Sequence, residues 1–282
     1  MPNRTLRSEL KRIIRERGLT RLASVLYDSV LRAELAAVRL VDDWHSRERL
    51  VSQANLTRVT AIVKTFERPA SLAKLMASAR RLFPDLHFVI ADDSAVPCDV
   101  SGAEVIPLPF DSGVSAGRKA ALERVQTEFT WVMDDDFVFY RETRLDRVIG
   151  LFDSHGEIDL IGGPVVDLPG FRKERGDPNR IYPTSAEPAL PIGAELGEAV
   201  ICNKVPNFFV ARTERLRLVN WTPEIKRLDH ADFFTRACGV LATAYLDSFR
   251  CLHARTPFDE HYLSFRLDLA RDREILKRRH RG

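Results

Sequence analysis

The stretch Thr130-Trp131-Val132-Met133-Asp134-Asp135-Asp136-Phe137-Val138-Phe139 places three consecutive carboxylates between two apolar runs. The first run predicts a buried β-strand that ends at the aspartates. Carboxylates packed so densely at a strand end repel one another unless a positive group neutralises them. Hard cations such as Mg²⁺ or Mn²⁺ bind carboxylate oxygens and keep sites open for water and substrate phosphates. The stretch therefore indicates a metal site, and the alternative is a solvated acidic turn.

The chain around this stretch predicts alternating strands and helices. The expected elements are strands at 59–63, 86–91 and 105–108 and helices at 69–82 and 118–125. That order predicts an α/β fold with a mostly parallel sheet flanked by helices. In open sheets of this kind, ligands bind beyond the carboxyl ends of the strands. The polar clusters expected at that edge are 64–68, 92–94 and 134–136.

Several motifs occur in the order found in one enzyme family. They are Lys64-Thr65-Phe66-Glu67-Arg68, Val89-Ile90-Ala91-Asp92-Asp93-Ser94, Ser115-Ala116-Gly117-Arg118, the aspartate stretch, Leu160-Ile161-Gly162-Gly163 and Asn207-Phe208-Phe209-Val210-Ala211-Arg212-Thr213. Together they resemble the family-2-like glycosyltransferases, and above all the β-1,4-N-acetylgalactosaminyltransferases of the ganglioside GM2/GD2 synthase type. The resemblance covers residues 58–255. It implies a Rossmann-like GT-A fold in which a nucleotide-sugar and a metal ion meet at an Asp-x-Asp motif.

The resemblance also implies a set of metal ligands for Mn²⁺ or Mg²⁺. Asp136 is expected to be the main protein ligand, while Asp134 contacts the ribose or reaches the metal through water. His253 occupies the matching late position, after a predicted strand, and is expected to be the third ligand. Asp135 is expected to point toward the sugar.

Nucleotide binding falls to residues at the ends of the first strands. The resemblance implies this role for Thr65, Phe66, Arg68, Asp92, Arg118, Asp134 and Asp135. Asp92 is expected to accept a hydrogen bond from the pyrimidine N3–H. The alternative role of Asp93 is to cap the turn that follows. The alternative for Arg118 is that it is an ordinary residue at the start of a helix.

The catalytic base of an inverting displacement must take a proton from the acceptor hydroxyl, which suits a carboxylate. Asp232 is the candidate, because Phe233 and Phe234 beside it would exclude water and raise its pKa. Asp229 and His230 are the next choices, and Asp232 has the alternative of capping a helix.

These residues predict a metal-dependent, inverting glycosyltransferase. Its donor would be a UDP-sugar, with GalNAc or another hexosamine as the sugar, and its acceptor a glycan, a glycolipid or a lipid-linked oligosaccharide. The alternatives are a sugar-nucleotide pyrophosphorylase and a non-catalytic, carbohydrate-binding relative. Pyrophosphorylases usually carry a glycine-rich phosphate loop after the first strand, and residues 64–69 lack one. The proline- and glycine-rich segment 164–199 is expected to be a loop that selects the acceptor.

Composition favours a cytoplasmic protein. A chain of 282 residues with 45% hydrophobic and 29% charged residues is typical of a globular protein, and a net charge of +3 is too small to indicate nucleic-acid binding. No apolar run approaches the roughly 20 residues that span a bilayer, and no signal sequence is predicted. The four cysteines lack the spacing of a metal site, which predicts reduced thiols.

Three regions are expected: a helical appendage at 1–55, the GT-A domain at 56–265 and a basic tail at 266–282. The apolar pattern of the appendage predicts one helix with Leu6, Leu10 and Ile13 on a single face, and then a second helix from Thr20. Either these helices pack on the domain or on a second subunit in a homodimer, or their basic surface and the tail lie on anionic lipid. The last alternative predicts a peripheral position on the inner face of the membrane.

Overall fold

The protein is described by a computed structural model. The structure describes residues 19–45, 52–173, 177–267 and 269–280. The first predicted helix, with Leu6, Leu10 and Ile13, lies outside the described residues.

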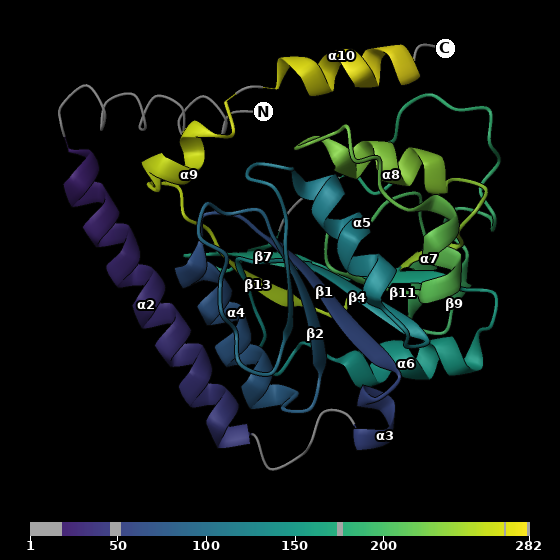
Figure 1. Cartoon of the computed structure of the whole chain (residues 1–282). Helices are drawn as coiled ribbons and strands as arrows, with labels where there is room; N and C mark the ends of the chain where they lie inside the picture. Colours follow the sequence, from purple (N-terminus) through teal and green to yellow (C-terminus); the bar gives the residue numbers. More distant parts are fainter. Residues whose placement is uncertain (1–18, 46–51, 174–176, 268, 281–282) are drawn as a thin grey trace.

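A large mixed sheet crosses the centre of the molecule (Figure 1). Within the described residues its strand order is β3 (Glu104–Pro107), β2 (His87–Asp92), β1 (Val59–Thr65), β4 (Phe129–Asp134), β11 (Phe209–Arg212), β6 (Leu160–Gly162), β12 (Thr243–Tyr245), β10 (Ala199–Ile201) and β9 (Glu195–Leu196). The first four strands pair in parallel. Only β11 and β10 run opposite to the other described strands of this sheet, so the predicted parallel direction dominates.

Alternation along the strands divides the apolar side chains between two faces of this sheet. In β4, Trp131 and Met133 join one core, which α4 (Pro69–Leu82) and α6 (Leu145–Ser154) cover. Val132 points into the other core, which α5 (Val114–Arg124), α7 (Thr213–Val219) and α8 (Asp229–Ala237) cover. The observed layers therefore confirm the predicted GT-A arrangement of a sheet between helices.

A smaller sheet extends the domain in the order β5 (Phe137–Val138), β13 (Cys251–Ala254), β7 (Val165–Leu168) and β8 (Arg172–Lys173). Its register sets His253 opposite Phe137, one residue beyond the aspartate triplet. The helix α2 (Thr20–His45) packs on this sheet through a small cluster around Leu31. The second helix of the predicted appendage therefore begins at Thr20, as expected, and lies along one edge of the domain (Figure 1).

Two local expectations differ from the structure. Helix α5 begins at Val114 rather than near 118, because Gly113 provides the positive φ of 99° that turns the chain into the helix. Gly117 is inside that helix, where an added Cβ would lie 2.3 Å from Cγ of Lys64. The segment 164–199 is not a plain loop, since it contains β7, β8 and β9.

The described part of the predicted tail forms α10 (Ala270–Arg279), which is attached to the domain. The Asp272 carboxylate accepts backbone N–H bonds from Lys226, Arg227 and Leu228 at 2.7–3.1 Å. No helix in the described part of the chain combines the length and the apolar character needed to cross a membrane.

Candidate functional site

Two of the three predicted polar clusters, 64–68 and 134–136, contribute residues to a cavity of about 690 Å³ beyond the ends of β1 and β4. Most of the residues predicted for the site line this cavity, namely Phe66, Arg68, Arg118, Asp134, Asp135, Asp136 and His253. Thr65, Asp92 and Asp232 are not among the lining residues. The structure therefore brings together residues that lie almost 190 positions apart in the chain.

Arg68 holds the second and third aspartates of the triplet. Its guanidinium donates to Asp136 at 2.8 Å and pairs with Asp135. The Thr65 hydroxyl donates to Asp135 at 2.8 Å, so Thr65 acts through this carboxylate and not on the cavity surface. Burial raises the pKa of Asp135 to about 6, against the opposing charge of Arg68. Asp135 is thus a buried anchor within the triplet.

Arg118 joins the first aspartate of the triplet to helix α8. Its guanidinium donates to Asp134 at 2.5 Å and to Asp229 at 2.7 Å, and the arginine is almost fully buried. Burial raises the pKa of Asp229, although the charge of Arg118 opposes that rise. A buried carboxylate with a raised pKa that faces a cavity has the properties of a general base.

His253 and Asp136 form a pair that fits a divalent cation. Nε2 of His253 lies 3.2 Å from a carboxylate oxygen of Asp136, so one cation at about 2.1 Å from each atom could bind both. Nδ1 of His253 lies 3.0 Å from Asp167, the type of outer contact that orients metal-binding histidines. Burial lowers the pKa of His253, but Asp136 and Asp167 outweigh it and raise that pKa to about 9.

In the described ranges no three His, Cys, Asp or Glu side chains are arranged as a complete metal site. Asp134, the other predicted ligand, is turned toward Arg118. The Asp136–His253 pair therefore fits a cation whose remaining ligands are water and substrate phosphates, which is common for Mg²⁺ and Mn²⁺.

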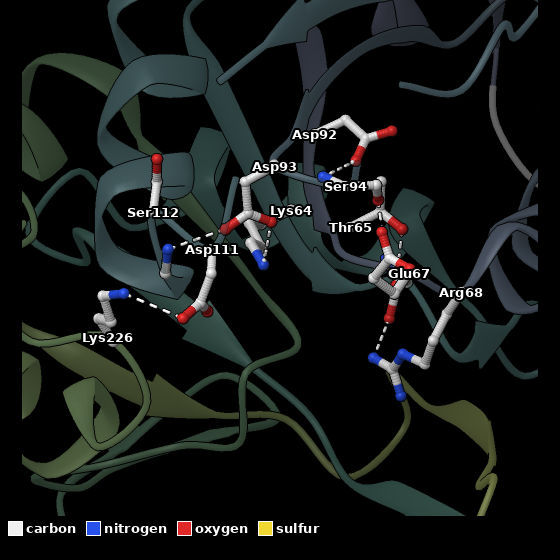
Figure 2. A network of polar contacts seen from close by, with 12 residues as sticks. Lys64, Thr65, Glu67, Arg68, Asp92, Asp93, Ser94, Asp111, Ser112 and Lys226 are labelled. Atoms are coloured by element: carbon white, nitrogen blue, oxygen red, sulfur yellow. Dashed lines mark hydrogen bonds and ion pairs between the residues drawn. The ribbon is translucent and has the colours of Figure 1, made fainter. Parts of the chain in front are cut away.

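Basic side chains outnumber carboxylates on the cavity wall. The basic residues are Lys64, Arg68, Arg118, Lys226, Arg227, Arg255 and Arg266, and the acidic ones are Asp111, Asp134, Asp135, Asp136 and Asp229. Asp111 pairs with Lys226 at 3.0 Å, and Lys64 pairs with Asp93 at 2.6 Å (Figure 2). Asp111 also pairs with Arg227 at 2.7 Å. The excess of positive charge suits an anionic ligand such as a diphosphate.

Lys226, Arg227 and Arg255 also line the cavity but are not among the residues predicted from the sequence. Lys226 and Arg227 lie in a loop just before α8, and Arg255 follows β13. No pattern in the sequence separates these residues from the many other basic residues of the chain. Only the tertiary fold, which brings these three residues to the cavity wall, distinguishes them from the other basic residues.

Aromatic rings form one end of the cavity. The Phe66 ring lies 5.4 Å from the Phe110 ring and 5.0 Å from the Phe265 ring, measured between centroids. Tyr262 places its ring 4.0 Å from the Arg68 guanidinium. Such rings are suited to stacking with a planar base.

Asp92 lies inside the domain instead of on the cavity wall. One of its oxygens accepts the backbone N–H of Ser94 at 2.8 Å (Figure 2), and the other accepts that of Cys98 at 2.7 Å. Asp93 likewise accepts the N–H of Gly113 at 2.8 Å. The two carboxylates therefore hold the loops after β2 and before α5 in position.

The expectation of a raised pKa for Asp232 is wrong. Burial would raise it, but ion pairs with Arg236 at 2.9 Å, His280 at 2.9 Å and Arg279 at 3.1 Å lower the pKa instead. The sequence shows only the two neighbouring phenylalanines, whereas the cations come from the next turn of α8 and from α10. Asp232 lies within α8 and connects it to the C-terminal helix.

We expect Asp232→Ala to lower the free energy of unfolding by about 2 kcal/mol near pH 7, because it removes the buried carboxylate whose hydrogen bonds with Arg236 and Arg279 connect α8 to α10. A carboxylate with a lowered folded pKa stabilises above its unfolded pKa, and this contribution is lost as pH falls through the folded pKa. The difference between variant and wild type should therefore shrink below about pH 4. Urea titrations at several pH values would measure this difference in the free energy of unfolding. Asp99→Ala, at an exposed aspartate, is the control. Equal stabilities at pH 7 would contradict the structural role.

A second cavity of about 780 Å³ adjoins the first one. Asp134, Asn207, His253 and Arg255 line both cavities. Its wall also includes His230, the residue that follows Asp229, and the imidazole Nε2 of His230 lies 2.7 Å from the backbone oxygen of Val205. The start of α8 thus lies where the two cavities meet.

The family model and the similar proteins indicate the same class of enzyme. The model of the family described as "Glycosyl transferase family 2" matches residues 60–213. Human β-1,4 N-acetylgalactosaminyltransferase 1 is 36% identical in an alignment of 199 residues that covers 65% of this chain and 36% of that protein. Mouse β-1,4 N-acetylgalactosaminyltransferase 2 is 33% identical over 193 residues, with the same shares. The chain thus spans about a third of the length of these relatives.

Solved structures show the same fold. Staphylococcus aureus TarS, residues 1–349 in complex with UDP-GlcNAc, aligns with a TM-score of 0.55 at 18% identity, over 73% of this chain and 61% of that one. The complex of the same TarS fragment with UDP aligns with a TM-score of 0.53 over 74% and 63% of the two chains.

Proposed function

Because the chain belongs to glycosyl transferase family 2, we propose that it transfers a sugar from a UDP-sugar to an acceptor hydroxyl, with inversion at the anomeric carbon. The observation that carries this proposal is the pair of adjoining cavities around Asp134, one basic and one less charged. A nucleotide-sugar would occupy the basic cavity, and the acceptor would approach from the other. The matched family favours this reaction over a pyrophosphorylase.

The donor nucleotide fits between the aromatic rings and the basic side chains. Its base would lie near Phe66 and its diphosphate near Arg68, Lys226 and Arg227, which line the same cavity. UDP and UDP-GlcNAc are the ligands of the similar TarS structures, and the related mammalian enzymes are named for GalNAc. These names support a UDP-hexosamine donor. Asp92 is assigned to holding the loop after β2, because its oxygens already accept two backbone N–H groups.

A divalent cation, Mn²⁺ or Mg²⁺, would be held by Asp136 and His253. When bound, it supplies positive charge that stabilises the leaving diphosphate. Arg68 now donates to the same Asp136 oxygen that lies nearest His253. Arg68 would therefore have to shift toward the diphosphate when the site is loaded.

Asp229 replaces Asp232 as the proposed base. In the displacement, the acceptor oxygen forms a bond to the anomeric carbon while the bond from that carbon to the diphosphate oxygen breaks, and the hydroxyl proton passes to Asp229. Asp229 lines the basic cavity and has a raised pKa, whereas Asp232 has neither property. His230 is less suited, because its ring nitrogen Nε2 already contacts the Val205 carbonyl.

UDP is expected to bind at least about tenfold more tightly than GDP or CDP, the scale of about one hydrogen bond. The UDP and UDP-GlcNAc ligands of the similar TarS structures favour a uridine nucleotide over the other two. Displacement of a fluorescent UDP analogue in the presence of Mn²⁺ would measure the order. Tighter binding of GDP than of UDP would contradict the assignment of the donor.

A further inference from the structure

The outer face of helix α2 is apolar and exposed to solvent. Six of its large apolar side chains are between 49% and 85% exposed: Leu22, Val25, Leu26, Val30, Leu40 and Trp44. The exposed alanines at 33, 36 and 37 fill the middle of the same face. An apolar surface of this extent on a folded domain indicates an interaction site.

The helical period places this face opposite the one that packs on the domain. Leu31 is buried on the small sheet, with Tyr27, Leu35 and Val38 beside it. Leu22 and Leu40 are each nine residues from Leu31, which is about two and a half turns, so they point directly away from the domain. Helix α2 of 26 residues is about 39 Å long, and apolar side chains follow the outer face from end to end.

We propose that the outer face of α2 lies on the surface of a lipid bilayer that carries anionic headgroups. A single partner helix contacts a narrow seam of about two positions in seven, but around Leu22 the outer face also presents Val25 and Leu26 in the same two turns. A flat hydrocarbon boundary can cover a face of that width, as it does for amphipathic helices that lie in the membrane interface.

Positive charge is in excess along one border of this face and in the sequence before it. Arg21, Arg32 and Arg39 are exposed along that border, together with Asp28 and Asp43. Residues 1–18 contain six arginines and lysines against two glutamates. Trp44, at 85% exposure, ends the face with a side chain that favours the headgroup level. Both charge and chemistry therefore match an anionic lipid surface.

The same helix touches the wall of the candidate site. The Tyr27 hydroxyl lies within hydrogen-bond distance of two backbone oxygens, those of Leu168 at 3.0 Å and Arg255 at 3.2 Å, and Arg255 lines both cavities. A bilayer at the outer face of α2 would therefore hold the cavities near the membrane. Lipid binding nevertheless stands apart from sugar transfer, and each can be tested without the other.

Flotation of the full chain with vesicles tests this proposal. We expect the protein to float with vesicles of phosphatidylcholine and phosphatidylglycerol, and to float much less with phosphatidylcholine alone. The double variant Leu22→Glu/Leu40→Glu should lose at least about tenfold in binding, because it places two charges in the apolar contact. Leu218→Glu is the matched control, since Leu218 is 64% exposed on α7, on the other side of the molecule (Figure 1).

Thermal melting and UDP binding show that each variant is folded, and light scattering gives the mass in solution. Unchanged binding by the double variant, or absence of wild-type binding to the anionic vesicles, would overturn the proposal. A wild-type dimer that dissociates in the double variant, without vesicle binding, would assign the face to a second copy of the chain instead. An equal loss of vesicle binding in Leu218→Glu would also contradict the proposal, because it would show that the effect is not specific to the outer face of α2.

Discussion

Asp229→Asn is expected to lower the rate of sugar transfer by roughly 10²–10⁴-fold, the usual contribution of a general base. The amide keeps the size of the side chain and its oxygen can still accept from Arg118, but it cannot take the acceptor proton. Because this role belongs to the transition state, UDP affinity should change little. Transfer rates measured beside UDP binding for the same variant would test both expectations.

The pH dependence of the transfer rate is an independent test of Asp229 as the base. A base must be deprotonated to act, so activity should fall as pH drops through the pKa of Asp229, which burial raises above that of an ordinary aspartate. The residual activity of Asp229→Asn should lack this acid limb. Asp232→Asn, three residues away on the same helix, is the matched control. Normal transfer by Asp229→Asn, with loss in a stably folded Asp232→Asn, would return the base to Asp232.

Asp136→Ala is expected to lower turnover by at least about 10²-fold, on the scale of losing one charge-stabilising group. In the wild type, Mn²⁺ or Mg²⁺ should strengthen UDP binding, because the cation binds both protein and diphosphate. The variant should lose most of this metal effect. Calorimetry with UDP, in Mn²⁺ and in excess EDTA, would measure it.

Asp136 also pairs with Arg68, so the variant alone does not separate the loss of a metal ligand from the release of an arginine. His253→Ala separates them, because the Arg68 guanidinium bonds to Asp135 and Asp136 and not to the imidazole. If both residues hold one cation, the double variant should lose much less than the two single losses combined. Full activity of the wild type in excess EDTA would refute the metal assignment.

The helices and strands around the triplet could be predicted because their signals are local. Pro69 begins α4 and Leu82 ends it, as predicted, since proline fits the first turn and Leu72, Leu75 and Ala79 repeat at helical spacing. The β4 strand ends at Asp134, where the apolar run gives way to carboxylates. Strand direction then places these ends at one sheet edge, so the sequence alone located the candidate site.

Roles within the site depended on contacts that no local pattern encodes. Asp229 and Asp232 lie three residues apart on α8, and both are buried aspartates. Arg118 pairs with Asp229 at the cavity wall, whereas Arg236 from α8 and Arg279 from α10 pair with Asp232. Neighbours along the chain suggested a raised pKa at Asp232, and more distant charges reversed it.

The sequence by itself determined the α/β fold, the family and the strand-end position of the carboxylates, because periodicity and short motifs act over a few residues. Tertiary structure alone decided which carboxylate faces the cavity, which loop arginines join it and which apolar side of α2 stays exposed. Leu31 and Leu40 belong to one apolar helix and differ only in what lies against them. Charge and burial at a side chain are set by its neighbours in space, and those come from distant parts of the chain.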